Sequence, residues 1–125
     1  MTSALGHVLV VEDEPMIAME LVCALELQGA TVVGPFAGIR QATAAIENGA
    51  KLDGAVLDLN LGGELSFSVA DLLRANHIPF VFTTGYGLED LPRRYGQIPL
   101  LAKPIDPSQV IEKLAEIMAA SNRAE

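Results

Sequence analysis

Five short and almost uninterrupted apolar runs constrain the fold of this chain more than any other feature. They are His7–Val11, Thr31–Gly34, Ala55–Leu57, Phe80–Thr83 and Leu100–Ala102. Such runs are typical of parallel strands that are buried on both faces of a sheet. Helical patterns separate them, at Glu14–Gln28, Ile39–Asn48, Glu64–Ala75, a short stretch near Leu88–Tyr95, and Pro107–Ala120. This alternation predicts repeated βαβ units and therefore an α/β fold.

The length and composition fit a single domain over residues 1–125, with a core over about residues 7–120. Half of the residues are apolar, and a chain of this length can bury roughly two-thirds of its unfolded surface. No apolar run is long enough to span a bilayer, and the start lacks the basic segment that opens a signal peptide. We therefore expect a cytoplasmic protein without a membrane partner.

The charge and the rare residue types exclude several classes of function. A net charge of −8 argues against nonspecific binding to nucleic acid, because that binding depends on Lys and Arg neutralising phosphates. Cys23 is the only cysteine, so one chain can build neither a disulfide framework nor a cysteine zinc site. His7 and His77 are isolated in the pattern, and we interpret them as strand or loop residues rather than metal ligands.

The first predicted helix carries two apolar stripes. The stripe expected to face the core contains Ile17, Leu21, Ala24 and Leu25. A second stripe projects about 100° or more away from the first and contains Met16, Met19 and Cys23, next to Pro15. This second stripe fits either scattered exposed apolar residues, which monomers tolerate, or a docking face for a partner helix.

Three carboxylates follow two of the predicted strands. Glu12 and Asp13 come directly after the first strand, and Asp58 ends the third within the segment GAVLDLNLGG. Ligands of open parallel sheets bind beyond the carboxyl ends of the strands, so these groups meet if the two strands are neighbours. Clustered carboxylates repel one another unless they are protonated or held by a cation. Mg²⁺ suits such oxygen ligands, and the main-chain carbonyl of Asn60 can supply another.

Two more polar residues stand at strand ends. Thr84 places a hydroxyl after the fourth strand, and Lys103 places an ammonium group after the fifth. Taken alone, Thr84 fits a turn residue, Lys103 a solvated surface charge, and the Glu12–Asp13 pair a fortuitous acidic rim. Their occurrence together with Asp58, each at a strand end, argues against a chance arrangement.

With these residues in this order, the sequence resembles the receiver domains of bacterial two-component response regulators, from His7 to Ala120. The matching positions are Glu12 and Asp13 as acidic pair, Asp58 as acceptor, Thr84 as hydroxyl switch, and Lys103 with Pro104 after a cis peptide bond. The resemblance implies a doubly wound, flavodoxin-like fold with five parallel strands in the order 2-1-3-4-5 and helices on both faces.

The resemblance also implies the chemistry. Asp58 would accept a phosphoryl group from the phosphohistidine of a histidine kinase or a histidine phosphotransfer protein. Mg²⁺ or Mn²⁺ would be held by Asp13, Asp58 and the carbonyl of Asn60, with Glu12 acting through water. Lys103 and Thr84 would bind phosphoryl oxygens, and Gly85 would leave room for the incoming group. Such a protein performs only its own phosphorylation and dephosphorylation, and we do not expect a conventional enzyme.

The segment Phe82–Tyr86 is similar to the Phe-Ala-Thr-Gly signature of the alphaproteobacterial subfamily nicknamed FAT GUY, with Thr83 in place of Ala. That subfamily contains stand-alone receivers of the general stress response with a reduced fourth helix. Many receivers have an aromatic switch residue on the fifth strand, where this chain is aliphatic. Either Tyr86 takes over that role or it packs over the loop. The shortened fourth helix would weaken a common dimer face, so we expect a monomer or weak dimer.

Three other classes of function are alternatives to this interpretation. A phosphatase similar to the haloacid-dehalogenase-like hydrolases would need a second aspartate where this chain has Asn60. A nucleotide-binding module would need a third glycine and a basic residue near Gly85-Tyr86-Gly87. An interaction module whose pocket is never phosphorylated stays open, because the sequence does not exclude it.

Overall fold

The computed structural model describes residues 5–85 and 91–124. Its strands are β1 (His7–Val11), β2 (Thr31–Phe36), β3 (Gly54–Asp58), β4 (Asn60–Leu61), β5 (Glu64–Leu65), β6 (Phe80–Thr84) and β7 (Leu100–Ala102). Its helices are α1 (Pro15–Leu27), α2 (Ile39–Glu47), α3 (Phe67–Ala75), the 3₁₀ turn η1 (Arg93–Tyr95) and α4 (Pro107–Ala124).

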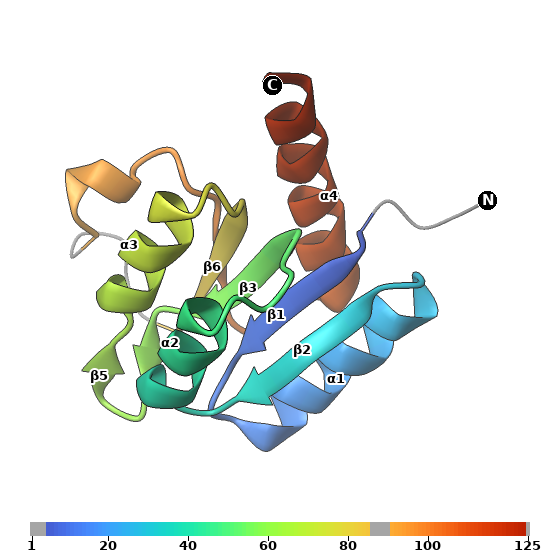
Figure 1. Cartoon of the computed structure of the whole chain (residues 1–125). Coiled ribbons are helices and arrows are strands. Elements are labelled where there is room, and N and C mark those ends of the chain that lie inside the picture. Colours follow the sequence, from blue (N-terminus) through green and yellow to red (C-terminus); the bar gives the residue numbers. More distant parts are fainter. Residues whose placement is uncertain (1–4, 86–90, 125) are drawn as a thin grey trace.

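The main sheet has five parallel strands in the order β2-β1-β3-β6-β7. This confirms the predicted doubly wound fold, because β6 and β7 are the fourth and fifth predicted strands. Helices α1 and α4 cover one face of the sheet, and α2 and α3 cover the other (Figure 1). The register pairs Val11 with Leu57 and Asp58 with Thr83, so the carboxyl ends of β1, β3 and β6 share one edge.

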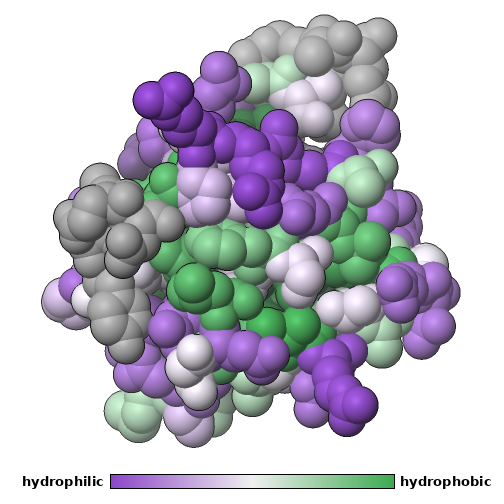
Figure 2. All heavy atoms as spheres, turned by 90° about the vertical axis from the view of Figure 1, so that its left-hand side faces the viewer, coloured by the Kyte–Doolittle hydropathy of each residue, from purple (hydrophilic) through white to green (hydrophobic). Residues whose placement is uncertain are grey.

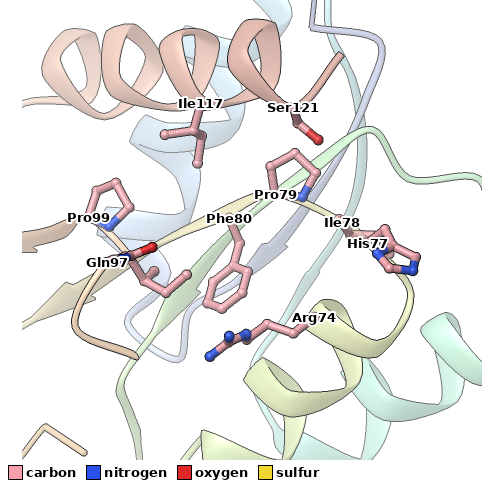
Figure 3. Close-up of a pocket in the computed structure, with 10 residues that line it drawn as sticks. Arg74, His77, Ile78, Pro79, Phe80, Gln97, Pro99, Ile117 and Ser121 are labelled. Atoms are coloured by element: carbon pink, nitrogen blue, oxygen red, sulfur yellow. The ribbon is translucent and has the colours of Figure 1, made fainter. Parts of the chain in front are cut away.

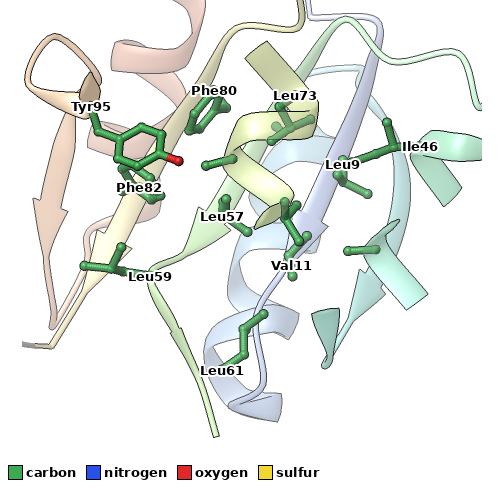
Figure 4. Packing of buried hydrophobic residues seen from close by; sticks show 14 residues of the cluster. Leu9, Val11, Ile46, Leu57, Leu59, Leu61, Leu73, Phe80, Phe82 and Tyr95 are labelled. Carbon is green, nitrogen blue, oxygen red and sulfur yellow. The ribbon is translucent and has the colours of Figure 1, made fainter. Parts of the chain in front are cut away.

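Each central strand contributes side chains to two separate apolar clusters. Leu9 and Leu57 pack with Leu73 of α3 on one face (Figure 4). On the other face, Val10 packs in a cluster with Leu114 of α4. Full burial of such a side chain contributes about 1.5 to 3 kcal/mol, so both helical layers are held by the same strands. This two-sided burial explains why the strands read as continuous apolar runs.

A short antiparallel hairpin, β4 and β5, follows β3 and was not predicted. Asn60 pairs with Leu65 across a turn made by Gly62 and Gly63, whose φ angles are 63° and 97°. Glycine adopts such positive φ angles without steric cost. The pairing keeps Leu65 out of the helix, so α3 begins at Phe67 rather than at the predicted Glu64.

The sequence analysis expected a reduced fourth helix in the connection between β6 and β7. The described part of it, from residue 91 onward, contains only the three-residue turn η1, and residues 86–90 lie outside the described residues. Tyr95 in η1 is completely buried and stacks on Phe67 of α3, with ring centroids 5.2 Å apart. Figure 2 looks onto this side of the molecule, where apolar side chains lie exposed between hydrophilic ones.

Of the two apolar stripes of α1, one faces the core and the other faces solvent, as predicted. Leu21 and Leu25 are fully buried, whereas Met16 and Met19 are 78% and 67% exposed. Cys23 is also exposed, and Leu27 extends the outer stripe to the end of the helix at 85% exposure. None of the helices in the described part of the chain combines the length and the hydropathy needed to cross a membrane.

Candidate functional site

Asp58 is the last residue of β3, where the apolar strand reaches the edge of the sheet. Its side chain is 3% exposed. The main-chain N–H of Asn60 donates to Oδ1 at 3.1 Å, and Nζ of Lys103 donates to Oδ2 at 2.9 Å. The buried hydroxyl of Ser66 donates to the main-chain carbonyl of Asp58 at 2.7 Å. The carboxylate is therefore held in one orientation from both sides.

Glu12 and Asp13 lie beside Asp58, as the strand order predicted. One carboxylate oxygen from each of the three residues lies within 4.8 Å of the others. Glu12 is 3% exposed, and its Oε2 accepts the N–H of Glu14 at 3.0 Å. Its Oε1 is buried without a hydrogen-bond partner among the described residues. An acidic cluster with an orphaned buried oxygen fits a divalent cation and its water, which would satisfy that oxygen.

Lys103 follows β7 and supplies the positive charge of the cluster. Its Nζ lies 2.9 Å from Asp58, 3.2 Å from Glu12 and 2.8 Å from Glu14. Its main-chain N–H donates to the carbonyl of Thr84 at 2.7 Å, which ties the loop after β7 to the end of β6. The peptide bond between Lys103 and Pro104 is cis.

The pKa values of these groups are coupled through their charges. Burial raises the pKa of Glu12 to about 7, and the charge of Asp58 adds to that rise. Burial also raises the pKa of Asp58, although the hydrogen bond from Lys103 opposes it. For Lys103, burial acts to lower the pKa, but the hydrogen bonds to Glu14 and Asp58 outweigh it and raise the pKa. Lys103 therefore stays protonated at neutral pH. Its single positive charge does not offset the negative charges of the clustered carboxylates, so the cluster favours a further cation.

A cavity of about 390 Å³ opens beside Asp58 at this edge of the sheet. Its lining consists of Asp13, Glu14, Asp58, Asn60, Gly62, Gly63, Gly85 and Lys103. A Cβ atom built on Gly85 would meet no described atom within 4 Å, so the space in front of this residue is open. Thr84 ends β6 and is 1% exposed, directly before Gly85.

The structure thus brings together the carboxylates, the lysine and the glycine that the sequence analysis selected. Asn60 lines the same cavity, with its side chain accepting the N–H of Gly63 at 2.7 Å. Pro15, with Met16 and Met19, lies on the exposed first half of α1, immediately after the cavity residue Glu14. Tyr86, the proposed aromatic switch, lies outside the described residues.

Three residues of this region were missed by the sequence analysis. Glu14 directly follows the acidic pair, and that position is the only signal that could have linked it to Lys103. Ser66 gave no signal, because its contact with Asp58 depends on the unpredicted hairpin. Tyr95 was expected only as the end of a short helix, yet its ring lies 5.5 Å from that of Phe82 on β6.

Comparisons with known proteins agree with this geometry. The chain matches the family described as the response regulator receiver domain over residues 8–115. It is 33% identical over 121 residues to the phyllosphere-induced regulator PhyR of Methylorubrum extorquens, covering 90% of this chain and 43% of that protein. The chain thus spans less than half the length of this curated relative.

Solved structures with higher sequence identity are also found. The solution structure of SdrG from Sphingomonas melonis Fr1 is 41% identical, with a TM-score of 0.79 over 94% of this chain and 99% of that one. A second structure, the BeF3-activated conformation of SdrG from Pseudomonas melonis Fr1, is 42% identical with a TM-score of 0.74 over the same shares. By its sequence, its fold and the arrangement of its acidic edge, this chain belongs to the response regulator receiver domains.

Proposed function

We propose that this protein accepts a phosphoryl group on Asp58 from the phosphohistidine of a histidine kinase or a histidine phosphotransfer protein. The observation that carries the proposal is the setting of Asp58. It is a buried carboxylate 2.9 Å from the ammonium group of Lys103, in a cluster of three carboxylates at an open cavity. Phosphoryl transfer depends on positioning and charge neutralisation, and this edge of the sheet supplies both.

In the proposed step, a carboxylate oxygen of Asp58 forms a bond to phosphorus while the bond between phosphorus and the donor's imidazole nitrogen breaks. The imidazole leaves with the electron pair, and Asp58 becomes an acyl phosphate. Lys103, already within hydrogen-bond distance of Asp58, offsets the charge on the phosphoryl oxygens. The Asn60 N–H keeps the carboxylate oriented throughout.

Mg²⁺ or Mn²⁺ is the cofactor of this proposal. Asp13, Asp58 and the carbonyl of Asn60 would hold the ion, with Glu12 acting through a bound water. When bound, the ion supplies positive charge between the carboxylates and the phosphoryl oxygens. The orphaned Oε1 of Glu12 supports this role, because a water on the ion would satisfy it.

Signalling would follow from the added group, which brings nearly two negative charges and three acceptor oxygens. That charge would draw Thr84 inward, and the main-chain N–H of Lys103 already ties the end of β6 at Thr84 to the segment that follows β7. The solved BeF3-activated conformation of SdrG supports activation by phosphorylation here. The output would be a phosphorylation-dependent interaction with another protein.

We extend the proposal to the cell. The similarity of Phe82–Tyr86 to the FAT GUY signature supports a role in general stress signalling in the cytoplasm. The signature likewise supports the expectation of a stand-alone receiver, as in that subfamily. Relay of the phosphoryl group, drainage of a kinase and regulation of a kinase are all compatible with such a role.

The test is incorporation of phosphoryl groups from acetyl phosphate, followed by the intact mass of the protein with and without Mg²⁺. We expect a gain of one phosphoryl group that needs the metal ion and that the Asp58→Asn variant loses. An interaction-only module would gain nothing from acetyl phosphate or from a kinase donor, which would refute the proposal. Sustained turnover of an unrelated phosphoester would indicate a phosphatase instead.

The exposed stripe of α1 is proposed as the face that docks the phosphodonor protein. Met16, Met19, Cys23 and Leu27 lie along its length, and the helix starts beside the cavity. The double variant Met16→Asp/Met19→Lys should slow phosphoryl transfer from a kinase while acetyl phosphate labels it at the wild-type rate. Because acetyl phosphate needs no protein docking, it is the matched control. An unchanged kinase rate in the folded variant would contradict a docking role.

A further inference from the structure

A second open site lies at the opposite end of β6 from Asp58. It is a groove of about 300 Å³ between α3, the starts of β6 and β7, and α4. Its residues are Arg74, His77, Ile78, Pro79, Phe80, Gln97, Ile98, Pro99, Ile117 and Ser121. Figure 3 shows Phe80 in the middle, with Ile117 and Ser121 on one side and Arg74 on the other. The groove has an apolar floor and polar groups at its rim, which is the anatomy of a protein interface.

The charge of this groove differs from that of the rest of the chain. The protein carries 16 acidic and 8 basic residues, yet no acidic residue is among the described residues that line the groove. Arg74 supplies a permanent positive charge, and His77 adds a second when protonated. Gln97 and Ser121 add neutral hydrogen-bond donors. The groove is thus complementary to a negatively charged group attached to an apolar one.

Arg74 is held ready for such a contact. One of its guanidinium nitrogens, Nη1, donates to the main-chain carbonyl of Arg94, and its Cζ lies 5.9 Å from the ring centroid of Tyr95. A guanidinium group has five N–H donors, and among the described residues only Nη1 of Arg74 has a hydrogen-bond partner. A side chain that is already ordered loses less entropy on binding.

The backbone at His77 carries an independent signal. Helices α1, α2 and α3 end in the same motif, in which the second residue after the helix has positive φ. In α1 and α2 this residue is Gly29 or Gly49, with φ of 86° and 83°. In α3 it is His77, with φ of 59°, and the N–H of Ile78 donates to Leu73 as the motif requires.

A side chain in this left-handed conformation costs stability that glycine would not. The chain uses glycine at the two other helix ends and accepts the cost only where the residue lines the groove. Residues held in strained backbone conformations cluster at binding sites. The imidazole of His77 is therefore expected to have a function that glycine cannot supply.

We infer that this groove docks an acidic peptide segment of a partner protein, with an apolar side chain against the half-buried Ile98 and Ile117 and carboxylates at its rim, one near Arg74 and one near His77. A peptide fits better than a small molecule, because small-molecule sites enclose most of their ligand. Here Arg74, His77 and Gln97 are exposed, and the groove is bounded by surface segments. The site is separate from the phosphoryl pocket and does not depend on the function proposed for Asp58.

The first experiment is a titration of the ¹⁵N-labelled full chain with an acetylated heptapeptide of alternating leucine and glutamate. The matched control peptide has lysine in place of glutamate. We expect saturable shifts of the amide signals of Arg74, His77, Ile78 and Ile98 with the acidic peptide, and binding at least about tenfold weaker for the basic one. No saturable shift at these amides, or equal binding of both peptides, overturns the inference.

The second experiment separates binding from structure through His77→Gly. Glycine relieves the positive φ angle, so the melting temperature should rise by roughly 3 to 5 °C. The same variant should bind the acidic peptide several-fold more weakly, because the imidazole is gone. A more stable variant with unchanged affinity would show that His77 has no part in binding and would overturn the inference. Arg74→Gln should also weaken binding, whereas the exposed Lys51→Gln, with the same charge change, should not.

Discussion

The ammonium group of Lys103 is shared among three carboxylates, and this sharing sets what the site can do at the scale of single residues. Glu12 and Asp58 are buried, whereas Glu14 reaches Lys103 at 2.8 Å from the exposed start of the first helix. Under the proposed function, Glu14 would compete with the phosphoryl group on Asp58 for the lysine. Glu14 would then modulate the site without belonging to the acidic pair.

We predict that Glu14→Gln speeds labelling by acetyl phosphate about two- to fivefold. The variant removes a negative charge that repels the donor and frees Lys103 to meet the phosphoryl oxygens. Glu20→Gln is the control, since it removes the same charge from an exposed position further along α1. The rates come from a time course of intact mass at fixed Mg²⁺. A labelling rate equal to that of the control variant, or below that of the wild type, would show that the contact between Glu14 and Lys103 does not slow labelling.

The raised pKa of Glu12 leads to a second prediction, on how the free energy of unfolding depends on pH. Its pKa is about 7 in the folded protein against 4.5 for the ordinary side chain. The folded state therefore binds the proton more tightly than the unfolded state does. The contribution of this proton to the free energy of unfolding is fully present below about pH 4.5 and is lost as the pH rises through 7. Without metal ions, the wild type should lose about 1 to 3 kcal/mol relative to Glu12→Gln across this range.

This comparison is made by urea unfolding of both proteins between pH 5 and pH 8 in the presence of a chelator. The Gln side chain can still accept the N–H of Glu14, so the hydrogen bond at 3.0 Å can be kept. Parallel curves for the two proteins would mean that Glu12 ionises normally and is not desolvated. Adding Mg²⁺ at pH 8 should stabilise the wild type more than the variant.

At the scale of elements, the short turn η1 lies in the described part of the connection between β6 and β7, and Tyr95 anchors it to α3. The Tyr95 hydroxyl donates to the carbonyl of Phe67 at 3.1 Å and also contacts the carboxylate of Asp71. Arg94 lies over the Tyr95 ring, with its Cζ 4.6 Å from the centroid, and pairs with Asp71 at 3.2 Å. These contacts join η1 to α3 next to β6, which carries Thr84.

We predict that Tyr95→Phe lowers the free energy of unfolding by about 1 kcal/mol. The substitution removes the hydroxyl, and with it the hydrogen bonds to Phe67 and Asp71, while the ring stays packed. Tyr95→Ala should cost about 3 to 5 kcal/mol, because it also empties a buried site next to Phe82. Urea unfolding of the three proteins measures both. Equal losses in the two variants would show that the ring packing between η1 and α3 contributes little.

The elements also show where prediction from sequence succeeds and fails. The five main strands follow from their apolar runs, because burial on both faces of a sheet produces that pattern, whereas their order was implied by the resemblance to receiver domains. The hairpin β4–β5 was not predicted, because each of its strands has only two residues, which is too few to give a periodic pattern in the sequence. Strand β2 likewise continues through Pro35 to Phe36, beyond its predicted end at Gly34, and the peptide bond between Gly34 and Pro35 is cis.

On the scale of the whole molecule, the chain keeps its two candidate sites at opposite ends of β6. The acidic pocket could be predicted because each of its main residues directly follows a strand, and strand order brings those ends together. The groove at Arg74 and His77 could not be predicted, because its residues come together only after folding. They belong to α3, to the starts of β6 and β7, and to the last turns of α4. Contacts of that kind leave no local pattern in a sequence.

The central claim is that Asp58 itself becomes the acyl phosphate, and the most direct measurement locates the modified residue. The protein is labelled with acetyl phosphate and Mg²⁺, reduced with borohydride, digested and sequenced by mass spectrometry. Reduction converts an aspartyl phosphate to homoserine, and we expect homoserine at position 58 of the peptide that contains GAVLDLNLGG. Homoserine at position 13 or 53, or a labelled protein in which Asp58 stays intact, would contradict the assignment of this carboxylate as the acceptor.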